Sequence, residues 1–449
     1  MDTKKVHLRA EGDLNTTEER LRWEQRNEHP ATKDLLNRDK AVFFHQALST
    51  PCLGVVVSAK GSEITLTDGR TLLDFHGNYI HHAGFAHPAI TKAVKEQIDL
   101  LSFSTRRYTN EPAIRLAEKL TRLSPSLNRL LFAPGGAEAI SMALKIARVV
   151  TGRHKTVSLW DSFHGATLDT ASVGGEATFR QHIGPLMPGT EHAPPPNPAE
   201  CPFRCGSTCN SSCADYVEYI LEKEGDVSAV VAETIRSSPF IPPKEYWKKV
   251  RAACDRHNAL LILDEIPHAL GRTGRMFTFQ HYEIEPDMVV IGKGLGGGLI
   301  PFAAVLGRDS FNVKIREHSL GHFTHEKSPV AAAAALALLQ VIEEENLLDH
   351  VNRMHIAAMQ KMREIQMNHP VVSDVRGLGL MLGLELRNPE SGEKALDEAE
   401  RVMYRSMELG LNFKLSMGNI INLTPPMNVT EEELSKAFSI IHQSLLEVS

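Results

Sequence analysis

The chain has 449 residues, of which 42% are hydrophobic and 23% are charged, and its formal net charge is -6 at pH 7. This composition is typical of a globular protein with a large buried core, and it argues against a disordered or fibrous chain. The sequence contains no block of Lys or Arg that could bind nucleic acid or an anionic membrane surface. We therefore expect small-molecule ligands.

The amino-terminal residues alternate in charge and lack the apolar core that a secretory signal needs. The longest apolar run, residues 329–342, is rich in Ala and too short to span a bilayer. We therefore expect a cytoplasmic protein with no membrane segment. The first sixty or so residues look irregular and polar, and Asp68 and Gly69 predict a hairpin turn within residues 65–74.

Short runs of β-branched apolar residues alternate with amphipathic stretches in the middle of the chain. Strands are expected at residues 227–232, 260–263 and 288–291, and a helix at residues 247–257. Such a pattern predicts a parallel sheet with helices on both faces. Later residues predict an α+β carboxy-terminal domain, with helices at 331–346, 347–368, 395–409 and 430–446 and strands near 371–375 and 380–386.

Four of the six cysteines recur at every fourth position of a Pro-rich segment, namely Cys201, Cys205, Cys209 and Cys213. Zinc sites usually have two residues inside each cysteine pair, so this spacing is loose for a metal site. We assign no metal ligand, and a structural metal stays an alternative to a reduced, cysteine-rich surface insertion. A disulfide is less expected in a reducing compartment.

Residues 291–301 read IGKGLGGGLIP. An apolar strand that ends beside Lys293, followed by several glycines, places one amine on backbone that a cofactor can approach closely. A nucleotide-phosphate loop is the competing interpretation. In such a loop Ser or Thr follows the Lys, whereas Gly294 follows here.

A pair of carboxylates, Asp264 and Glu265, follows the apolar run at residues 260–263. This is the strand end at which open α/β sheets place ligand groups. Asp264 could neutralise a protonated pyridine nitrogen, which is what makes pyridoxal phosphate (PLP) an electron sink. Capping of the next helix is the structural alternative.

Two further motifs could hold such a cofactor. A turn of small residues, with Gly135, Gly136 and Ala137, leads into an amphipathic helix, and its backbone amides would form an anion site for a phosphate. Phe163 offers an aromatic face on which a pyridine ring could stack.

In their order and spacing these motifs resemble the class III aminotransferases, a fold-type-I PLP family. The resemblance extends from about residue 68 to 429 and rests on GAEA at 136–139, FHG at 163–165, Glu233, DEIPHALGRTG at 264–274, PD at 286–287 and KGLGGG at 293–298. It implies an α/β fold with a mostly parallel seven-stranded sheet in a large domain of residues 76–328. Residues 1–75 would contribute to an α+β small domain formed by residues 329–449.

The resemblance also implies roles for single residues. Lys293 would hold PLP as a Schiff base, and Asp264 would bind its pyridine nitrogen. Ile266 would pack on the ring face opposite Phe163. Thr324 matches the Thr that reaches the cofactor phosphate from the neighbouring subunit, which implies a homodimer with shared active sites. The other cofactor-binding positions are Gly135, Gly136, Ala137, His164 and Glu233.

The sequence departs from the family where many members bind a substrate carboxylate. Asn422 stands at the family's Arg position before the Pro-Pro pair, and a neutral amide cannot make the bidentate carboxylate pair of an Arg. The Glu that often masks this Arg would fall near Ser238. Pro267 replaces a Gln that supports the cofactor's ring hydroxyl. These differences argue against ordinary α-amino-acid transamination.

Basic residues elsewhere could bind a more highly charged anion, such as a phosphonate or a phosphate. Arg106 and Arg107 lie in the segment that borders the substrate entrance in the family. As an alternative, each could be a solvated surface side chain. Less certain candidates are Arg204, Arg236 and Lys327.

In the segments DEIP, GLGGGLIPFAA and GHFTHEKSP, the sequence looks like the lyase branch of the family, the 1-hydroxy-2-aminoethylphosphonate ammonia-lyases. This likeness implies a β-elimination that converts 1-hydroxy-2-aminoethylphosphonate to phosphonoacetaldehyde and ammonia. The alternatives are an ω-aminotransferase for amines that lack an α-carboxylate, a phosphoethanolamine-type phospho-lyase, an aminomutase, and a non-catalytic protein that binds PLP or a metal.

Overall fold

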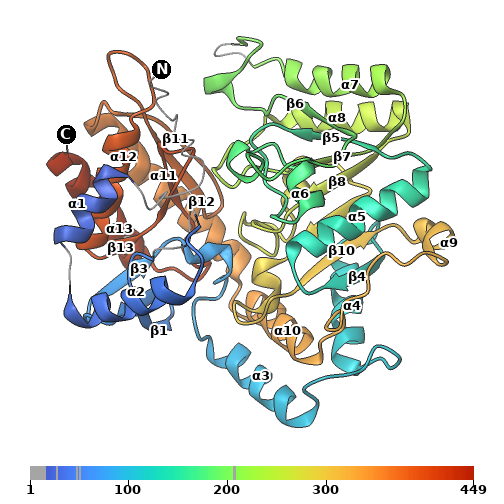
Figure 1. Ribbon diagram of the computed structural model, residues 1–449, viewed down its shortest axis with the longest axis horizontal. Coiled ribbons are helices and arrows are strands. Elements are labelled where there is room, and N and C mark those ends of the chain that lie inside the picture. The colour runs from blue at the N-terminus through green and yellow to red at the C-terminus, as the bar shows by residue number, and fades with distance from the viewer. Residues whose placement is uncertain (1–16, 27–28, 47–48, 50–51, 206–208, 449) are drawn as a thin grey trace. The chain divides into compact units, whose positions relative to one another are not determined.

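A computed structural model describes residues 17–26, 29–46, 49, 52–205 and 209–448 (Figure 1). The chain divides into two compact units: unit 1 comprises Met1–His87 and Asp349–Ser449, and unit 2 comprises Pro88–Leu348. These limits differ from the predicted boundaries after residues 75 and 328. The difference at the second boundary arises because α10 (Pro329–Glu344) packs against α3 (Pro88–Leu100) and α4 (Glu111–Leu123), so this helix belongs to unit 2.

Unit 2 is built on a seven-stranded sheet in which β10 is antiparallel to its two neighbours and the other pairings are parallel. All residues of β7 and β9 are buried, because helices cover both faces of such a sheet. The predicted α/β fold is confirmed. In spatial order the strands are β4 (Arg129–Ala133), β10 (Ala303–Gly307), β9 (Met288–Ile291), β8 (Leu260–Asp264), β7 (Val227–Glu233), β5 (Lys155–Leu159) and β6 (Thr190–Ala193).

Helix α5 (Gly136–Thr151) packs its apolar face on the centre of this sheet, against β7, β9 and β10. Helices α7 (Ser212–Glu224) and α8 (Lys244–His257) lie side by side in Figure 1. The remaining helices of unit 2 are α6 (Leu168–Val173), α9 (Asn312–Ile315), η2 (Ala177–Phe179), η3 (Pro198–Glu200), η4 (Thr278–His281), η5 (Lys293–Gly296) and η6 (Asp309–Phe311).

Unit 1 contains two four-stranded sheets. One has the order β1 (Val56–Lys60), β2 (Glu63–Leu66), β3 (Thr71–Asp74) and β13 (Leu411–Asn412); the other has the order β11 (Val372–Leu378), β12 (Met381–Leu386), β15 (Ile420–Leu423) and β14 (Lys414–Ser416). The hairpin predicted at Asp68 and Gly69 is confirmed, since β2 and β3 pair antiparallel and Gly69 has a φ of 86°. The helices include η1 (Gly77–Tyr79), α11 (Leu347–Asn368), α12 (Leu396–Glu408) and α13 (Glu431–Val448).

The expectation of an irregular amino-terminal segment is wrong for the residues that the structure describes there. They form α1 (Glu18–Arg26), α2 (Pro30–Val42) and β1. Trp23 of α1 stacks on Tyr404 of α12, with ring centroids 5.4 Å apart, and Glu19 of α1 lies 3.8 Å from Arg401 of α12, so an aromatic contact and an ion pair anchor this polar helix. Within the described residues, no helix has both the length and the apolar character needed to cross a membrane.

Candidate active site

Acidic and basic residues meet at one edge of the unit 2 sheet. Strand β7 ends at Glu233 and β8 ends at Asp264, and these two residues are directly paired across the two strands. The next strand, β9, ends at Ile291, two residues before Lys293. Because the carboxyl ends of parallel strands share one edge, the fold places the predicted cofactor residues where α/β sheets bind ligands.

Asp264 is 2% exposed, and two donors fix its carboxylate. Nδ1 of His164 donates to Oδ2 over 2.8 Å, and the backbone N–H of Ile266 donates to Oδ1 over 3.0 Å. On the other side of the imidazole, Nε2 of His164 lies 3.4 Å from Oγ of Ser158. A buried carboxylate held in this way has one orientation, which suits it to face a cationic ring nitrogen.

Lys293 opens the short helix η5 with a φ of 45°, a backbone conformation that is uncommon for a residue with a side chain. Such strain persists only where the surroundings enforce it, and it is concentrated at functional sites. The side chain is only partly buried, although Gly294 and Leu295 beside it are buried. The amine of Lys293 is therefore presented from a rigid and largely enclosed turn.

The proposed phosphate site is the start of α5. Gly135 is the N-cap residue and offers no side-chain cap, so no side chain satisfies the first-turn N–H groups of Gly136 and Ala137, which form the positive end of the helix dipole. A Cβ atom at Gly136 would lie 2.8 Å from Cδ1 of Ile266, and one at Gly292 would lie 3.3 Å from Cγ2 of the same side chain. Ile266 therefore packs between the phosphate loop and the segment that carries Lys293.

Phe163 is fixed by a buried ionic cluster that the sequence did not indicate. Its backbone N–H donates to Oε2 of Glu233 over 3.5 Å, and its ring lies 4.4 Å from that of Phe179. Arg236 lies 2.9 Å from the same Glu233 oxygen and 2.7 Å from Oε2 of Glu176. Two buried carboxylates thus neutralise Arg236. The suggestion that Arg236 binds a substrate anion is therefore not supported by its surroundings.

Two further buried polar residues lie beside the strand end and were given no role in the sequence analysis. The Glu265 carboxylate accepts from Oγ1 of Thr234 and from the N–H groups of Thr278 and Phe279, and burial raises the pKa of Glu265 to about 7. Burial lowers the pKa of His268 to about 3, so its ring is neutral. Glu265 was noticed as the second acid of the motif, whereas nothing in the sequence marks His268.

The predicted substrate residues lie in different parts of the chain. Arg106 and Arg107 are exposed, and Arg106 hydrogen-bonds to His322 in the segment that leads to Thr324, which is also exposed. Asn422 lies in unit 1, on β15, and is 1% exposed. The roles of these residues stay predictions. Arg204 and Lys327 are exposed as well.

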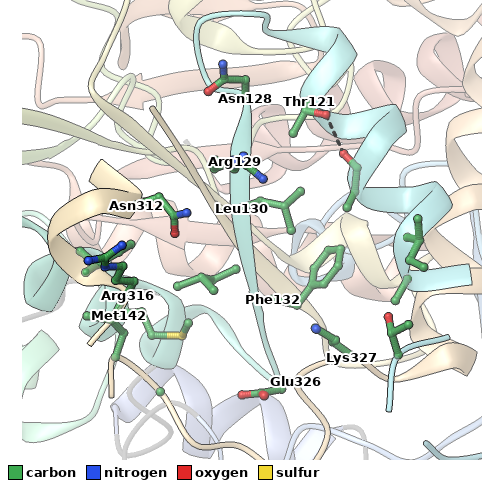
Figure 2. A pocket seen from close by; sticks show the side chains of 18 of the residues that line it. Thr121, Asn128, Arg129, Leu130, Phe132, Met142, Asn312, Arg316, Glu326 and Lys327 are labelled. Atoms are coloured by element: carbon green, nitrogen blue, oxygen red, sulfur yellow. Dashed lines mark hydrogen bonds between the residues drawn. The ribbon is translucent and has the colours of Figure 1, made fainter. Parts of the chain in front are cut away.

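An open pocket of about 760 Å³ lies in unit 2 near this segment. Figure 2 shows Asn312 and Arg316 on one side of it and Glu326 with Lys327 on another, and β4 with Leu130 and Phe132 between them. Its lining therefore includes residues two and three positions after Thr324.

The cysteine segment shows close thiols without a metal-binding geometry. The Sγ atoms of Cys201 and Cys205 are 3.6 Å apart, and all six cysteines are free. Residues 206–208 lie outside the described part of this segment. Among the residues described, no group of three or more His, Cys, Asp or Glu side chains could hold a metal ion.

The residues at the sheet edge fit PLP. The helix start supplies amides for a phosphate, Asp264 a fixed buried carboxylate for a pyridinium, and Lys293 an amine for an aldehyde. Cβ atoms at Gly136 and Gly292 would press on Ile266, so the small residues keep these segments close together.

Comparisons with known proteins agree with this fit. The family model for class III aminotransferases matches residues 45–445. The (R)-1-hydroxy-2-aminoethylphosphonate ammonia-lyase of Vibrio splendidus is 46% identical, over 99% of this chain and 96% of that protein. The leucine/methionine racemase of Thermococcus litoralis is 33% identical, over 93% and 96%. The PLP-bound structure of an amine transaminase from an uncultivated Pseudomonas species is 26% identical, with a TM-score of 0.85 over 91% of this chain and 99% of that one.

Proposed function

We propose that this chain, which belongs to the class III aminotransferase family, is a PLP-dependent ammonia-lyase that acts on 1-hydroxy-2-aminoethylphosphonate. The observation that carries the proposal is the 46% identity to an ammonia-lyase of that name along 99% of the chain. The cofactor residues at the sheet edge support the enzyme class, and Asn422 at the family's Arg position supports a substrate without an α-carboxylate.

When bound, PLP supplies an electron sink for the carbon that carries the substrate nitrogen. Asp264, held by His164, would keep the pyridine nitrogen protonated. Lys293 would take the proton from that carbon and then protonate the hydroxyl that leaves the neighbouring carbon. The elimination releases one water, and hydrolysis of the resulting enamine consumes one water and gives phosphonoacetaldehyde and ammonia.

Ammonia release without an amino acceptor tests this function. Purified holoenzyme is incubated with 1-hydroxy-2-aminoethylphosphonate, with and without pyruvate, and ammonia and aldehyde are measured. We expect equal amounts of both products over many turnovers, and no effect of pyruvate. If no ammonia is released without pyruvate, and alanine forms when pyruvate is added, the lyase is excluded.

An ω-aminotransferase is the second candidate, favoured by the likeness to the amine transaminase structure. It would use Lys293 and Asp264 in the same positions but would return the proton to the cofactor and require a keto acid. A phospho-lyase would release inorganic phosphate from phosphoethanolamine. The aminotransferase is tested by the same incubations, and the phospho-lyase by a parallel incubation with phosphoethanolamine in which inorganic phosphate is measured.

The proposal has three further parts. The protein is a homodimer with shared active sites, it is cytoplasmic, and it acts in phosphonate catabolism. The exposed position of Thr324, next to the open pocket, suits a side chain that serves a second copy of the chain. That copy would cover the face which includes Glu326 and Lys327 (Figure 2).

A further inference from the structure

Two of the four cysteines in the Pro-rich segment of unit 2 lie side by side. The Sγ atoms of Cys201 and Cys205 are 3.6 Å apart, within hydrogen-bonding distance for sulfur. A turn brings them together, because the backbone N–H of Arg204 donates to the carbonyl of Cys201 over 3.0 Å and Arg204 has a left-handed φ of 52°. A disulfide needs sulfurs about 2.05 Å apart, so a short approach separates these free thiols from a bond.

The surroundings of Cys201 favour its thiolate form. The sulfur accepts from the backbone N–H of Cys205, and this hydrogen bond, opposed by burial, lowers the pKa of Cys201 below its ordinary value. The backbone N–H groups of Phe203 and Arg204 lower it further. Because the thiolate and not the thiol attacks an electrophile, Cys201 is the nucleophile of the pair.

Cys205 is held next to this nucleophile by contacts with the start of α7. Its Sγ donates to Oδ1 of Asn210 over 3.1 Å, and the same oxygen accepts from the backbone N–H of Ser212 over 3.1 Å. Phe203, between the two cysteines, has its ring 5.8 Å from that of Tyr216 on α7. These contacts attach the turn to the helix, so Cys205 stays within reach of Cys201.

Exposure and charge separate this pair from three other cysteines of the chain. Cys201 and Cys205 are partly exposed, and the three residues between them are exposed, so a small oxidant can reach both sulfurs. Burial raises the pKa of Cys213 and of Cys254 to about 12, so neither is a thiolate near neutral pH. Cys52 is partly exposed, but desolvation raises the pKa of its thiol as well.

We propose that Cys201 and Cys205 form a reversible oxidation site that reacts with hydroperoxides, independently of the proposed catalysis. The Cys201 thiolate attacks the O–O bond of hydrogen peroxide, which gives a sulfenic acid and hydroxide, and the hydroxide takes up a proton to become water. The Cys205 sulfur then attacks the sulfenic sulfur, and its proton leaves with the hydroxyl as a second water. Two thiols are thus oxidised to one disulfide while one peroxide is reduced to two waters. A dithiol reverses the oxidation.

The test treats reduced holoenzyme with hydrogen peroxide, counts free thiols, and locates disulfides by peptide mass spectrometry after alkylation. We expect the wild type to lose two of its six free thiols to a disulfide between Cys201 and Cys205, and to recover them with dithiothreitol. Cys201→Ser should slow the loss of thiols about tenfold, because the thiolate is gone. Cys205→Ser should stop at a sulfenic acid that dimedone traps on Cys201. The control Cys52→Ser, at another partly exposed cysteine, should match the wild type.

A second measurement uses the unaltered protein. The rate of alkylation by iodoacetamide is followed against pH for each cysteine, and the midpoint for Cys201 should lie below that for Cys52. Peroxide-treated wild type without a disulfide between Cys201 and Cys205 overturns the inference, as does the reverse order of these midpoints. Zinc held by these cysteines in stoichiometric amount would also overturn it, because the thiolates would then be metal ligands. None of these measurements uses turnover, so failure of the lyase assay leaves them unaffected.

Discussion

The proposed chemistry depends on how single side chains are held at the ends of β7, β8 and β9. Asp264 is fixed by His164 and by the backbone of Ile266, and Glu233 is fixed by Arg236. In both cases a buried acid has a defined partner, which removes its freedom to reorient. The carboxylate that we propose to face a pyridinium therefore has one orientation, set by the protein itself.

We predict that Asp264→Asn retains PLP but lowers kcat about a thousandfold, or about 4 kcal/mol of barrier, because a neutral amide no longer favours the protonated pyridine nitrogen. The measurement combines the cofactor's visible absorbance with the rate of ammonia release. Asp99→Asn, at an exposed position of α3, is the matched control and should match the wild type. A loss of less than about tenfold in Asp264→Asn would show that this carboxylate has another role.

Among the helices and strands, the sequence predicted best those elements that have a clear apolar pattern. The prediction for residues 288–291 matches β9, and the helix expected at 347–368 matches α11, because long apolar periodicity specifies such elements. Helices α1 and α2 were missed because they are polar, and α2 buries none of its residues. The Pro at the start of α2 was the available signal, since Pro favours the first position of a helix.

The candidate site shows the same limit. Lys293, Asp264 and the small-residue turn could be identified because each belongs to a local motif at a strand end or a helix start. The contact of Arg236 with Glu176 joins residues 60 positions apart, and the contact of His164 with Asp264 joins residues 100 positions apart. Neither is encoded in a short sequence pattern, so both needed the folded chain.

In unit 1, one buried acid on β12 should give the protein an acid-sensitive element. Burial alone would raise the pKa of Glu385, but Arg376 and Arg387, each 2.7 Å from one of its oxygens, lower it below its usual value. Because the pKa of Glu385 is lowered in the folded state, its ionised carboxylate stabilises the fold. This stabilisation is complete above the ordinary glutamate pKa of about 4.3 and is lost as the pH falls through the pKa of the folded state.

We predict that Glu385→Gln lowers the free energy of unfolding by about 2 kcal/mol at pH 7, as expected for hydrogen bonds to charged groups. The difference from wild type should shrink as the pH falls below about 4.3. The free energy of unfolding is measured by urea titration at several pH values, with circular dichroism as the signal. Glu390→Gln, at an exposed position, serves as the control. A difference that grows on acidification would mean that the sign of the pKa shift is wrong.

For the whole molecule, the proposed dimer makes each active site depend on two chains. Thr324 is exposed in a single chain, in a segment that also lines the open pocket (Figure 2). If Thr324 serves the neighbouring cofactor, two defects in different chains can complement each other, whereas two defects within one site cannot.

Hybrid dimers test this arrangement. We predict that a dimer of one Thr324→Ala chain and one Lys293→Ala chain, isolated with two affinity tags, has higher activity than either variant alone. Its site with an intact Lys293 would receive the intact Thr324 of the other chain, giving about half of the wild-type activity by counting sites. Activity no higher than that of the Thr324→Ala homodimer would place Thr324 in the site of its own chain.

The most direct test of the lyase is a reaction with no keto acid present. Holoenzyme is mixed with excess 1-hydroxy-2-aminoethylphosphonate, while the cofactor absorbance and free ammonia are followed together. We predict that ammonia rises far beyond one equivalent per active site and that the cofactor keeps the absorbance of its aldehyde form. Conversion of one equivalent of cofactor to stable pyridoxamine phosphate, with no free ammonia, would contradict the lyase and identify an aminotransferase.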